Sequence, residues 1–226
     1  MSYSRRIVCL ANSRKPHGIC VAGREVLGNG YGDWIRPVSN RPTEEIRLEE
    51  YRYENGREAR VLDVIEIPMI APGPRAHQTE NHVIDAGKRW SRKSALAMTD
   101  LPSLVERPAS LWLNGYSTYH GKNDCVPETH AGQFSNSLFL IMPETLNVRV
   151  QTENVMSGPA KKRVRAEFTY NGTGYNFIVT DIATEQAFLL RDEGVFPITG
   201  AYMCVSLTQA YEGDGRCHKL VATIIG

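Results

Sequence analysis

The sequence predicts a mainly β protein with short helices, organised as two small β units in tandem. Short runs of β-branched and apolar residues recur along the chain, and turn sequences rich in Gly, Pro and Asn separate them. The length of 226 residues accommodates two units of about 100 residues each. Because isolated hairpins are marginal in water, this many short strands must close into barrels or sandwiches.

The first half of the chain begins with a buried strand at residues 7–10, and 21–22 are its expected partner across a loop at 12–18. Three glycines in six residues then predict a turn before a strand at 34–38, which Pro37 confines to an edge or a strand end. The charge-rich stretch 41–60 is expected to form a solvated loop or one short helix. Alternation at 61–67 predicts a strand with one exposed face.

Residues 75–108 are expected to connect the halves as a docked linker, with a short helix at 94–98. The second half is more plainly β. Strict alternation at 164–170, followed by Asn171 and Gly172, predicts a hairpin with 175–179. The remaining elements expected there are strands at 138–141, 148–150, 202–207 and 220–225, and a helix at 184–190.

About five strands and one helix in each half match two tandem OB-like small β-barrels packed together. The expected domains are 1–105, a first barrel with the docked linker, and 106–226, a second barrel. Periodicity does not distinguish these from SH3-like barrels or from one continuous barrel, and it does not give the strand order.

Composition limits the kind of function. Lys and Arg number 26 against 25 Asp and Glu, so the net charge of +1 creates no global attraction to a polyanion. Any nucleic-acid site must therefore be a local patch. No apolar run approaches the roughly 20 residues of a membrane span, and the start of the chain lacks a signal peptide, so we expect a cytoplasmic protein with no membrane partner.

Neither a metal, a cofactor nor a catalytic centre is predicted. The five cysteines are odd in number and never in CxxC spacing, which argues against disulfides and a zinc ribbon. Two loose groups of His and acidic residues, at 77–85 and 120–130, lack a recognised ligand spacing. No convincing pair of carboxylates and no activated nucleophile is present, so the protein is more consistent with a binding module than with an enzyme.

Several stretches together resemble the prokaryotic dual OB-containing domain family. They are residues 7–15, 18–23, 34–39, 202–207 and 217–222. The resemblance implies a tandem pair of OB-like barrels, nucleic acid as the ligand, and an association with bacterial conflict or defence systems, including a partner protein from a defence operon. It carries over no catalytic residues.

The first candidate site is the donor-rich group Asn12, Ser13, Arg14 and Lys15, which follows a strand directly. A loop at a barrel rim is where OB-type folds hold phosphates and bases. The alternative is a solvated turn, because Asn and Ser are common turn residues.

The second candidate is Trp34 with Arg36, which share one face of a strand and could combine base stacking with a phosphate contact. The competing interpretation, which we favour, places Trp34 in the core with Arg36 extending past it.

The third candidate is the cationic run that contains Lys161, Arg163 and Arg165. Alternation places Arg163 and Arg165 on the exposed face of a strand, where they could follow a phosphate backbone. Protection of an edge strand by charge explains the same residues equally well.

These observations favour a non-catalytic module that binds single-stranded or structured DNA or RNA. The alternative is a small-molecule or nucleotide sensor, or a small enzyme, with a pocket near Asn12 to Lys15. A purely structural adaptor is a third interpretation, which the near-neutral net charge mildly favours.

Overall fold

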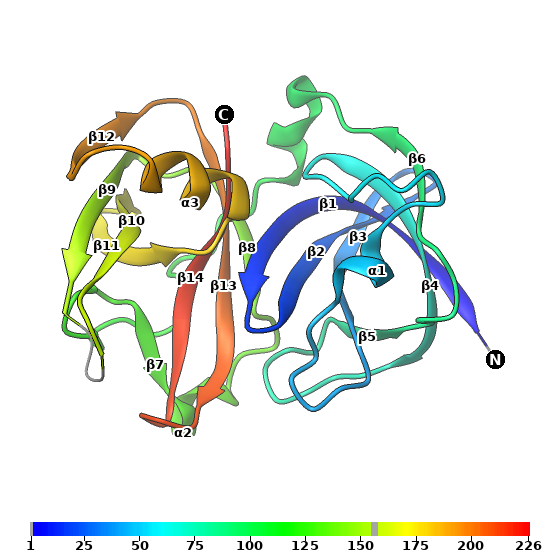
Figure 1. Cartoon of the computed structure of the whole chain (residues 1–226), viewed down its shortest axis with the longest axis horizontal. Helices are drawn as coiled ribbons and strands as arrows, with labels where there is room; N and C mark the ends of the chain where they lie inside the picture. The colour runs from blue at the N-terminus through cyan, green and yellow to red at the C-terminus, as the bar shows by residue number, and fades with distance from the viewer. Residues whose placement is uncertain (1, 155–157) are drawn as a thin grey trace. The chain divides into compact units, whose positions relative to one another are not determined.

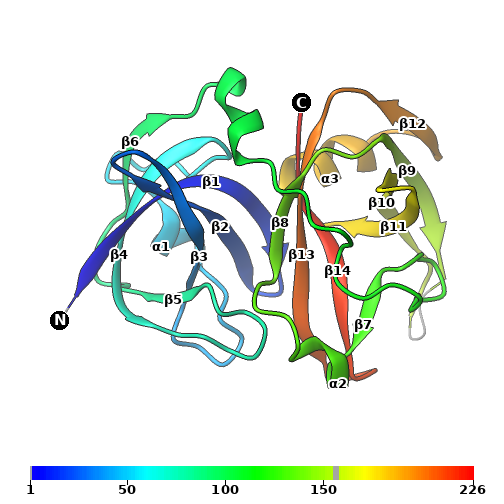
Figure 2. The same ribbon diagram turned by 180° about the vertical axis from the view of Figure 1, so that it is seen from behind.

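The computed structural model describes residues 2–154 and 158–226, which divide into two compact, mainly β units with short helices (Figures 1 and 2). Unit 1 comprises Met1–Val105 and Ser135–Ser137, and unit 2 comprises Glu106–Phe134 and Leu138–Gly226. The expected fold class, mainly β with short helices, is confirmed. No helix in the described ranges is long and apolar enough to cross a membrane.

The described residues of unit 1 form six strands, one short α-helix and one 3-10 helix. In chain order they are β1 (Tyr3–Lys15), β2 (Gly18–Leu27), β3 (Gly30–Val38), α1 (Leu48–Tyr51), β4 (Asp63–Pro72), β5 (Asn81–Ile84), β6 (Ser91–Ala95) and η1 (Met98–Leu104). The strand pairings return on themselves in the order β1, β2, β3, β5, β4, because β4 pairs with β1 as well. Only the β3–β5 pair within this ring is parallel.

Strand β1 hydrogen-bonds along both of its edges. Its first part pairs with β4 and its later part with β2, and Ile7 and Val8 take part in both pairings. A shift in register between Cys9 and Ala11 marks a bulge, which bends a strand and increases its twist. Opposite the bulge, a Cβ on Gly23 would lie 2.0 Å from the carbonyl oxygen of Val8, so only glycine fits there.

Unit 2 contains eight strands and two α-helices within its described residues. They are β7 (Cys125–Pro127), α2 (Glu128–Ala131), β8 (Leu138–Ile141), β9 (Thr145–Glu153), β10 (Lys161–Tyr170), β11 (Thr173–Val179), α3 (Ile182–Leu189), β12 (Gly194–Ile198), β13 (Tyr202–Tyr211) and β14 (Arg216–Ile225). The strands are paired in the order β12, β9, β10, β11, β14, β13, β8, and β7 pairs with β14.

The order of unit 2 repeats that of unit 1. Strands β9, β10 and β11 correspond to β1, β2 and β3, α3 corresponds to α1, and β11 pairs in parallel with β14 as β3 does with β5. The place of β1 is divided between two strands. β8 pairs with β13 as the first part of β1 pairs with β4, and β9 pairs with β10 as the later part of β1 pairs with β2. Unit 2 therefore keeps the same sequence of pairings with its first strand interrupted at 142–144.

Most expected elements are present, including the hairpin whose turn uses the left-handed conformations of Asn171 and Gly172 (φ 48° and 69°). Three expectations are wrong. The stretch 75–108, expected to be a docked linker, contains β5 and β6, and β5 pairs with both β3 and β4, so the stretch forms part of the sheet of unit 1. The helix at 94–98 is absent, because 91–95 form β6 and pair with β4, and a tertiary pairing overrides the weak helical preference of five residues. The loop at 12–18 is also largely strand, because Asn12 to Lys15 pair with Val21 to Gly18.

We expect Gly23→Ala to destabilise unit 1 by about 1–3 kcal/mol, because the added methyl group meets the backbone of Val8 rather than a movable side chain. Urea unfolding followed by circular dichroism measures the change. Gly28→Ala is the matched control, since no atom lies within 4 Å of a Cβ at that position. Equal stability of the two variants would contradict this account of the bulge.

Candidate nucleic-acid interface

The first predicted site lies at the end of the β1–β2 hairpin in unit 1. The turn itself consists of Pro16 and His17 only, and His17 has a left-handed backbone (φ 66°). Asn12 donates from Nδ2 to the carbonyl oxygen of Ala59 at 3.0 Å, and Ser13 is buried. These two side chains therefore help to hold the hairpin in place.

Arg14 and Lys15 are the accessible part of this group. Arg14 is exposed and Lys15 is half-buried. Among residues 2–154 and 158–226, Lys15 makes no ion pair or side-chain hydrogen bond. The hairpin end thus offers two neighbouring cations beside a short, exposed turn.

The second predicted pair lies inside unit 1. Trp34 is 6% exposed and Arg36 is 4% exposed. Arg36 forms an ion pair with Glu80 (Nη2 to Oε1, 3.2 Å) and donates to Ser137 Oγ at 2.7 Å. Ser137 in turn donates to Glu80 at 2.5 Å. The expected core position of Trp34 is confirmed, and the stacking platform with Arg36 is not present at the surface.

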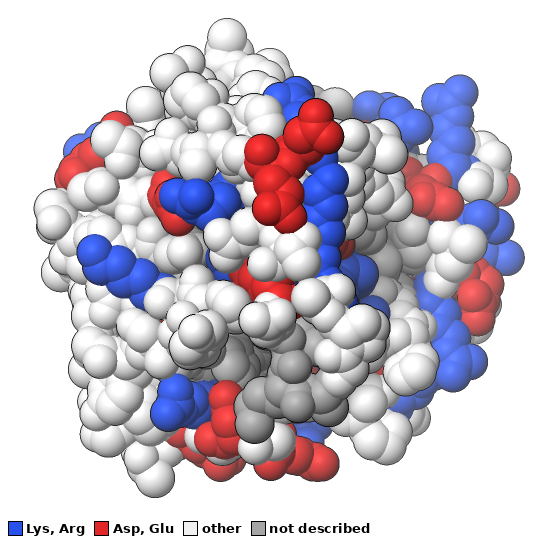
Figure 3. Space-filling view, turned by 60° about the vertical axis from the view of Figure 1, so that its left-hand side comes forward, with Lys and Arg blue, Asp and Glu red and all other residues white. Residues whose placement is uncertain are grey.

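The third group, at the start of β10 in unit 2, separates into exposed and buried cations. Lys161 is exposed and Arg163 is half-buried, and neither forms an ion pair within the described part of the chain. Lys162 donates from Nζ to the carbonyl oxygen of Leu189 at 3.1 Å, at the C-terminal end of α3, where a cation is favourable. On the face in Figure 3, basic side chains lie beside acidic ones at several separate places, with larger areas of other residues between them.

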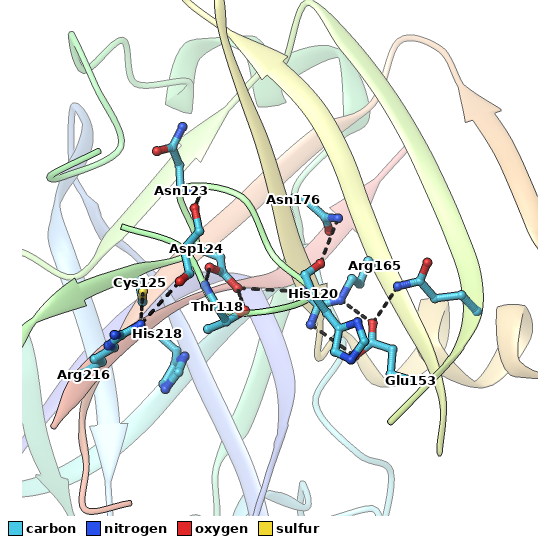
Figure 4. Close-up of polar contacts among 12 residues, drawn as sticks. Thr118, His120, Asn123, Asp124, Cys125, Glu153, Arg165, Asn176, Arg216 and His218 are labelled. Atoms are coloured by element: carbon cyan, nitrogen blue, oxygen red, sulfur yellow. Dashed lines mark hydrogen bonds and ion pairs between the residues drawn. The ribbon is translucent and has the colours of Figure 1, made fainter. Parts of the chain in front are cut away.

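Arg165 is buried at 6% exposure, so its expected position on the exposed face is wrong. Its guanidinium binds Glu153 through Nε at 2.5 Å and Nη2 at 3.2 Å, and Nη1 lies 3.8 Å from Asp124 (Figure 4). Burial alone raises the pKa of a carboxyl, but hydrogen bonds from Arg165 and Gln151 outweigh it and hold the pKa of Glu153 below its ordinary value.

Arg165 stands directly opposite Arg149 on β9, an arrangement of like charges that is unfavourable by itself. Each arginine is neutralised by a glutamate on the other strand. Arg149 binds Glu167 at 2.6 and 3.0 Å, and Arg165 binds Glu153. The two bidentate pairs allow four charges to occupy one face of the β9–β10 pair.

Residues 113–124, which we call the covering segment, lie over this face of unit 2. Lys122 and Asn176 of β11 exchange two backbone hydrogen bonds of 3.2 and 3.0 Å, and Asn123 Nδ2 donates to the carbonyl oxygen of Gly174 at 3.0 Å. Thr118 donates to Asp124 from its backbone nitrogen at 2.7 Å and from Oγ1 at 2.5 Å. The segment removes Arg165 from solvent.

The tight turn of the covering segment depends on Gly121. A Cβ at this position would lie 1.7 Å from Oδ2 of Asp124. Glycine is therefore required for the carboxylate of Asp124 to reach both Thr118 and the guanidinium of Arg165.

Lys219 of β14 anchors the start of the same segment and is 1% exposed. Its Nζ donates to the carbonyl oxygen of Leu113 at 2.7 Å and to Asn114 Oδ1 at 3.3 Å, and it faces the rings of Tyr175 and Phe177. Burial lowers the pKa of Lys219 to about 7, although Cys125 and Asp124 act in the opposite direction.

The two groups of His and acidic residues are distributed among other contacts. Glu80 binds Arg36, and His82 Nδ1 and the Tyr3 hydroxyl are 2.6 Å apart. His120 Nε2 lies 3.1 Å from the carbonyl oxygen of Asn154, and Asp124 binds Thr118. Within residues 2–154 and 158–226, no three His, Cys, Asp or Glu side chains are placed to hold a metal ion.

Sequence reasoning did not find Glu153, Asp124 as a partner of Arg165, or the exposure of Tyr119. Tyr119 is 94% exposed. Alternation along β10 predicted which face of the strand carries Arg165. No local pattern indicates that a segment distant in the sequence covers that face. Tyr119 lies in polar sequence without periodicity, so nothing in the sequence distinguished it from a buried tyrosine.

The repeated strand order of the two units agrees with a comparison of the sequence with known families. The sequence model of the dual OB-containing domain family matches residues 5–224, nearly the whole chain. The chain belongs to the dual OB-containing domain family. Searches of curated proteins and of solved structures give no significant match.

For this dual OB-containing protein, we expect Arg165→Ala to lower the free energy of unfolding by about 3–5 kcal/mol, because Glu153 would stay buried without its cation. Arg163→Ala, two residues earlier on the same strand, is the control and should change stability by no more than about 0.5 kcal/mol. Chemical denaturation of both variants makes the comparison. A small effect of Arg165→Ala would mean that the buried pair is not important for folding.

Stability should also depend on pH through Lys219. Its pKa is about 7 in the folded chain and 10.5 ordinarily, so between these values the unfolded chain binds more protons. The free energy of unfolding therefore rises with pH in this window, by up to about 1.4 kcal/mol per pH unit.

Lys219→Met removes this contribution while keeping an unbranched side chain in the same place. The difference in unfolding free energy between the original chain and Lys219→Met should increase from pH 7 towards pH 10, since other titrating groups largely cancel in the comparison. Urea titrations at several pH values measure it. A difference that does not change with pH would exclude a depressed lysine pKa.

Proposed function

We propose that this protein is a non-catalytic nucleic-acid-binding module that acts on single-stranded or structured DNA or RNA. The observation that carries the proposal is the position of the accessible cations in a dual OB-containing protein. Arg14 and Lys15 lie at the end of the β1–β2 hairpin. In OB folds the loop between the first two strands is one of the regions that bind oligonucleotides.

The distribution of charge supports unit 1 as the main contact for phosphates. Unit 1 contains 16 Lys and Arg against 13 Asp and Glu, whereas unit 2 contains 10 against 12. The net charge of +1 is thus the sum of +3 (16 − 13) in unit 1 and −2 (10 − 12) in unit 2. Unit 2 contributes locally through Lys161 and Arg163, which are not neutralised by described partners.

The two buried arginines among the predicted site residues stabilise the units rather than bind the ligand in this proposal. Arg36 and Arg165 each neutralise an acidic side chain within their own unit, so they do not contact phosphates. A cytoplasmic location, a bacterial defence system as the context, and a partner protein from the same operon are further parts of the proposal. Co-purification of the protein from its native host, with and without nuclease treatment, tests that association.

Fluorescence anisotropy with labelled single-stranded DNA, single-stranded RNA and duplexes tests nucleic-acid binding directly. Affinity should fall steeply between about 50 and 200 mM salt, because phosphate contacts release counterions. Joint substitution Arg14→Ala and Lys15→Ala should weaken binding to a single strand. It should also reduce the slope of log affinity against log salt by about 0.7 for each phosphate that the variant no longer neutralises.

The matched control is Arg57→Ala, which removes an exposed cation from the stretch between α1 and β4 of the same unit. It should leave affinity and salt slope nearly unchanged. The proposal fails if no oligonucleotide binds at low salt. The assignment to the hairpin end fails if Arg57→Ala and the double variant lose affinity equally.

A further inference from the structure

The ring of Tyr119 in the covering segment is almost fully exposed, at 94%. Its aromatic contact is with His120, whose ring centroid lies 4.8 Å away in an edge-to-face arrangement. Scattered apolar groups are common at protein surfaces, so exposure alone does not indicate a function. The surroundings of Tyr119 provide two further observations.

The backbone on both sides of Tyr119 is fixed. Thr118 binds Asp124 through its backbone nitrogen and its hydroxyl. The carbonyl oxygen of His120 accepts a hydrogen bond from Asn176 Nδ2 at 3.2 Å (Figure 4). The ring atom Nε2 of His120 lies 3.1 Å from the carbonyl oxygen of Asn154. A ring held out by an ordered segment loses little conformational freedom when a ligand stacks on it.

Accessible cations lie beside the residues that hold His120. Asn154 directly follows Glu153, and the register pairs Glu153 with Lys161 and Gln151 with Arg163. Arg165 forms ion pairs with both Glu153 and Asp124, so these three buried groups together keep one negative charge. Lys161 and Arg163 form no ion pair among the described residues, so their charges are accessible to a ligand on the strand pair that His120 contacts.

We propose that Tyr119 stacks on an unpaired base of a single-stranded nucleic acid while Lys161 and Arg163 contact its phosphates. An aromatic face and a cationic track are the two components by which proteins hold single strands without reading their sequence. This inference rests on the proposed function and deepens it, because it assigns a second contact to unit 2 and selects single strands over duplexes.

Anisotropy with a fluorescein-labelled oligothymidine of about 20 nucleotides tests the stacking contact. Tyr119→Ala should weaken binding by about 5- to 150-fold, the range for loss of one stacked base. Tyr119→Phe keeps the ring and should retain most of the affinity. Tyr211→Ala, which removes another exposed tyrosine of unit 2, is the control and should bind like the original chain.

Fluorescence provides a readout that does not depend on affinity. The three native tryptophans are buried: Trp34 is 6% exposed, Trp90 0% and Trp112 4%. Tyr119→Trp therefore introduces the one solvent-exposed indole among the described residues. Its emission should be red-shifted, and oligothymidine should quench it. An abasic oligonucleotide of the same length has phosphates but no bases and should leave the emission unquenched.

The outcomes separate the two proposals. If the original chain binds no nucleic acid, the proposed function fails and this inference fails with it. If the original chain binds but Tyr119→Ala binds equally well, or Tyr119→Trp is not quenched, the inference is overturned and the proposed function stands. Equal losses by Tyr119→Ala on single strands and on duplexes would also overturn it, because stacking requires an unpaired base.

Discussion

Unit 1 depends on a first strand, β1, whose two edges are both hydrogen-bonded, and unit 2 divides the corresponding pairings between two strands. In unit 1 one strand satisfies both edges, and it does so by bending at the bulge near Leu10, where Gly23 allows two backbones to approach closely. In unit 2 the corresponding pairings are made by β8 and β9, which are separated by residues 142–144, where the strand is interrupted. Pairing with two different neighbouring strands is thus achieved by bending one strand in unit 1 and by using two separate strands in unit 2.

Local sequence was sufficient to predict the elements whose formation depends on local pattern. Strict alternation identified β10, and Asn171 with Gly172 identified its turn into β11, because turn geometry and face periodicity are properties of neighbouring residues. The residues at 12–15 were expected to form a loop because they are polar. They extend β1 because β2 lies opposite, and polarity does not prevent a strand from pairing.

The candidate site was harder to predict, because burial depends on segments far apart in the chain. Arg36 meets Glu80 and Ser137, and Arg165 meets Glu153 and Asp124, so each cation is enclosed by partners between 12 and 101 residues away. Two arginines that alternation makes equivalent therefore have different environments: Arg163 is half-buried, and Arg165 is buried between two carboxylates. Charge along a strand indicates where cations lie, and only the fold shows which of them a ligand can reach.

Unit 1 is completed by residues that are made late. Ser137, in the segment Ser135–Ser137 that belongs to unit 1, supplies the hydroxyl group between Arg36 and Glu80. During synthesis from the N-terminus, a chain that has left the ribosome only as far as residue 105 has all the strands of unit 1 but lacks this hydroxyl. Arg36 and Glu80 can pair by that point, but the hydroxyl group that bonds both of them is made only about thirty residues later. Unit 1 therefore reaches its final state only after part of unit 2 has been synthesised.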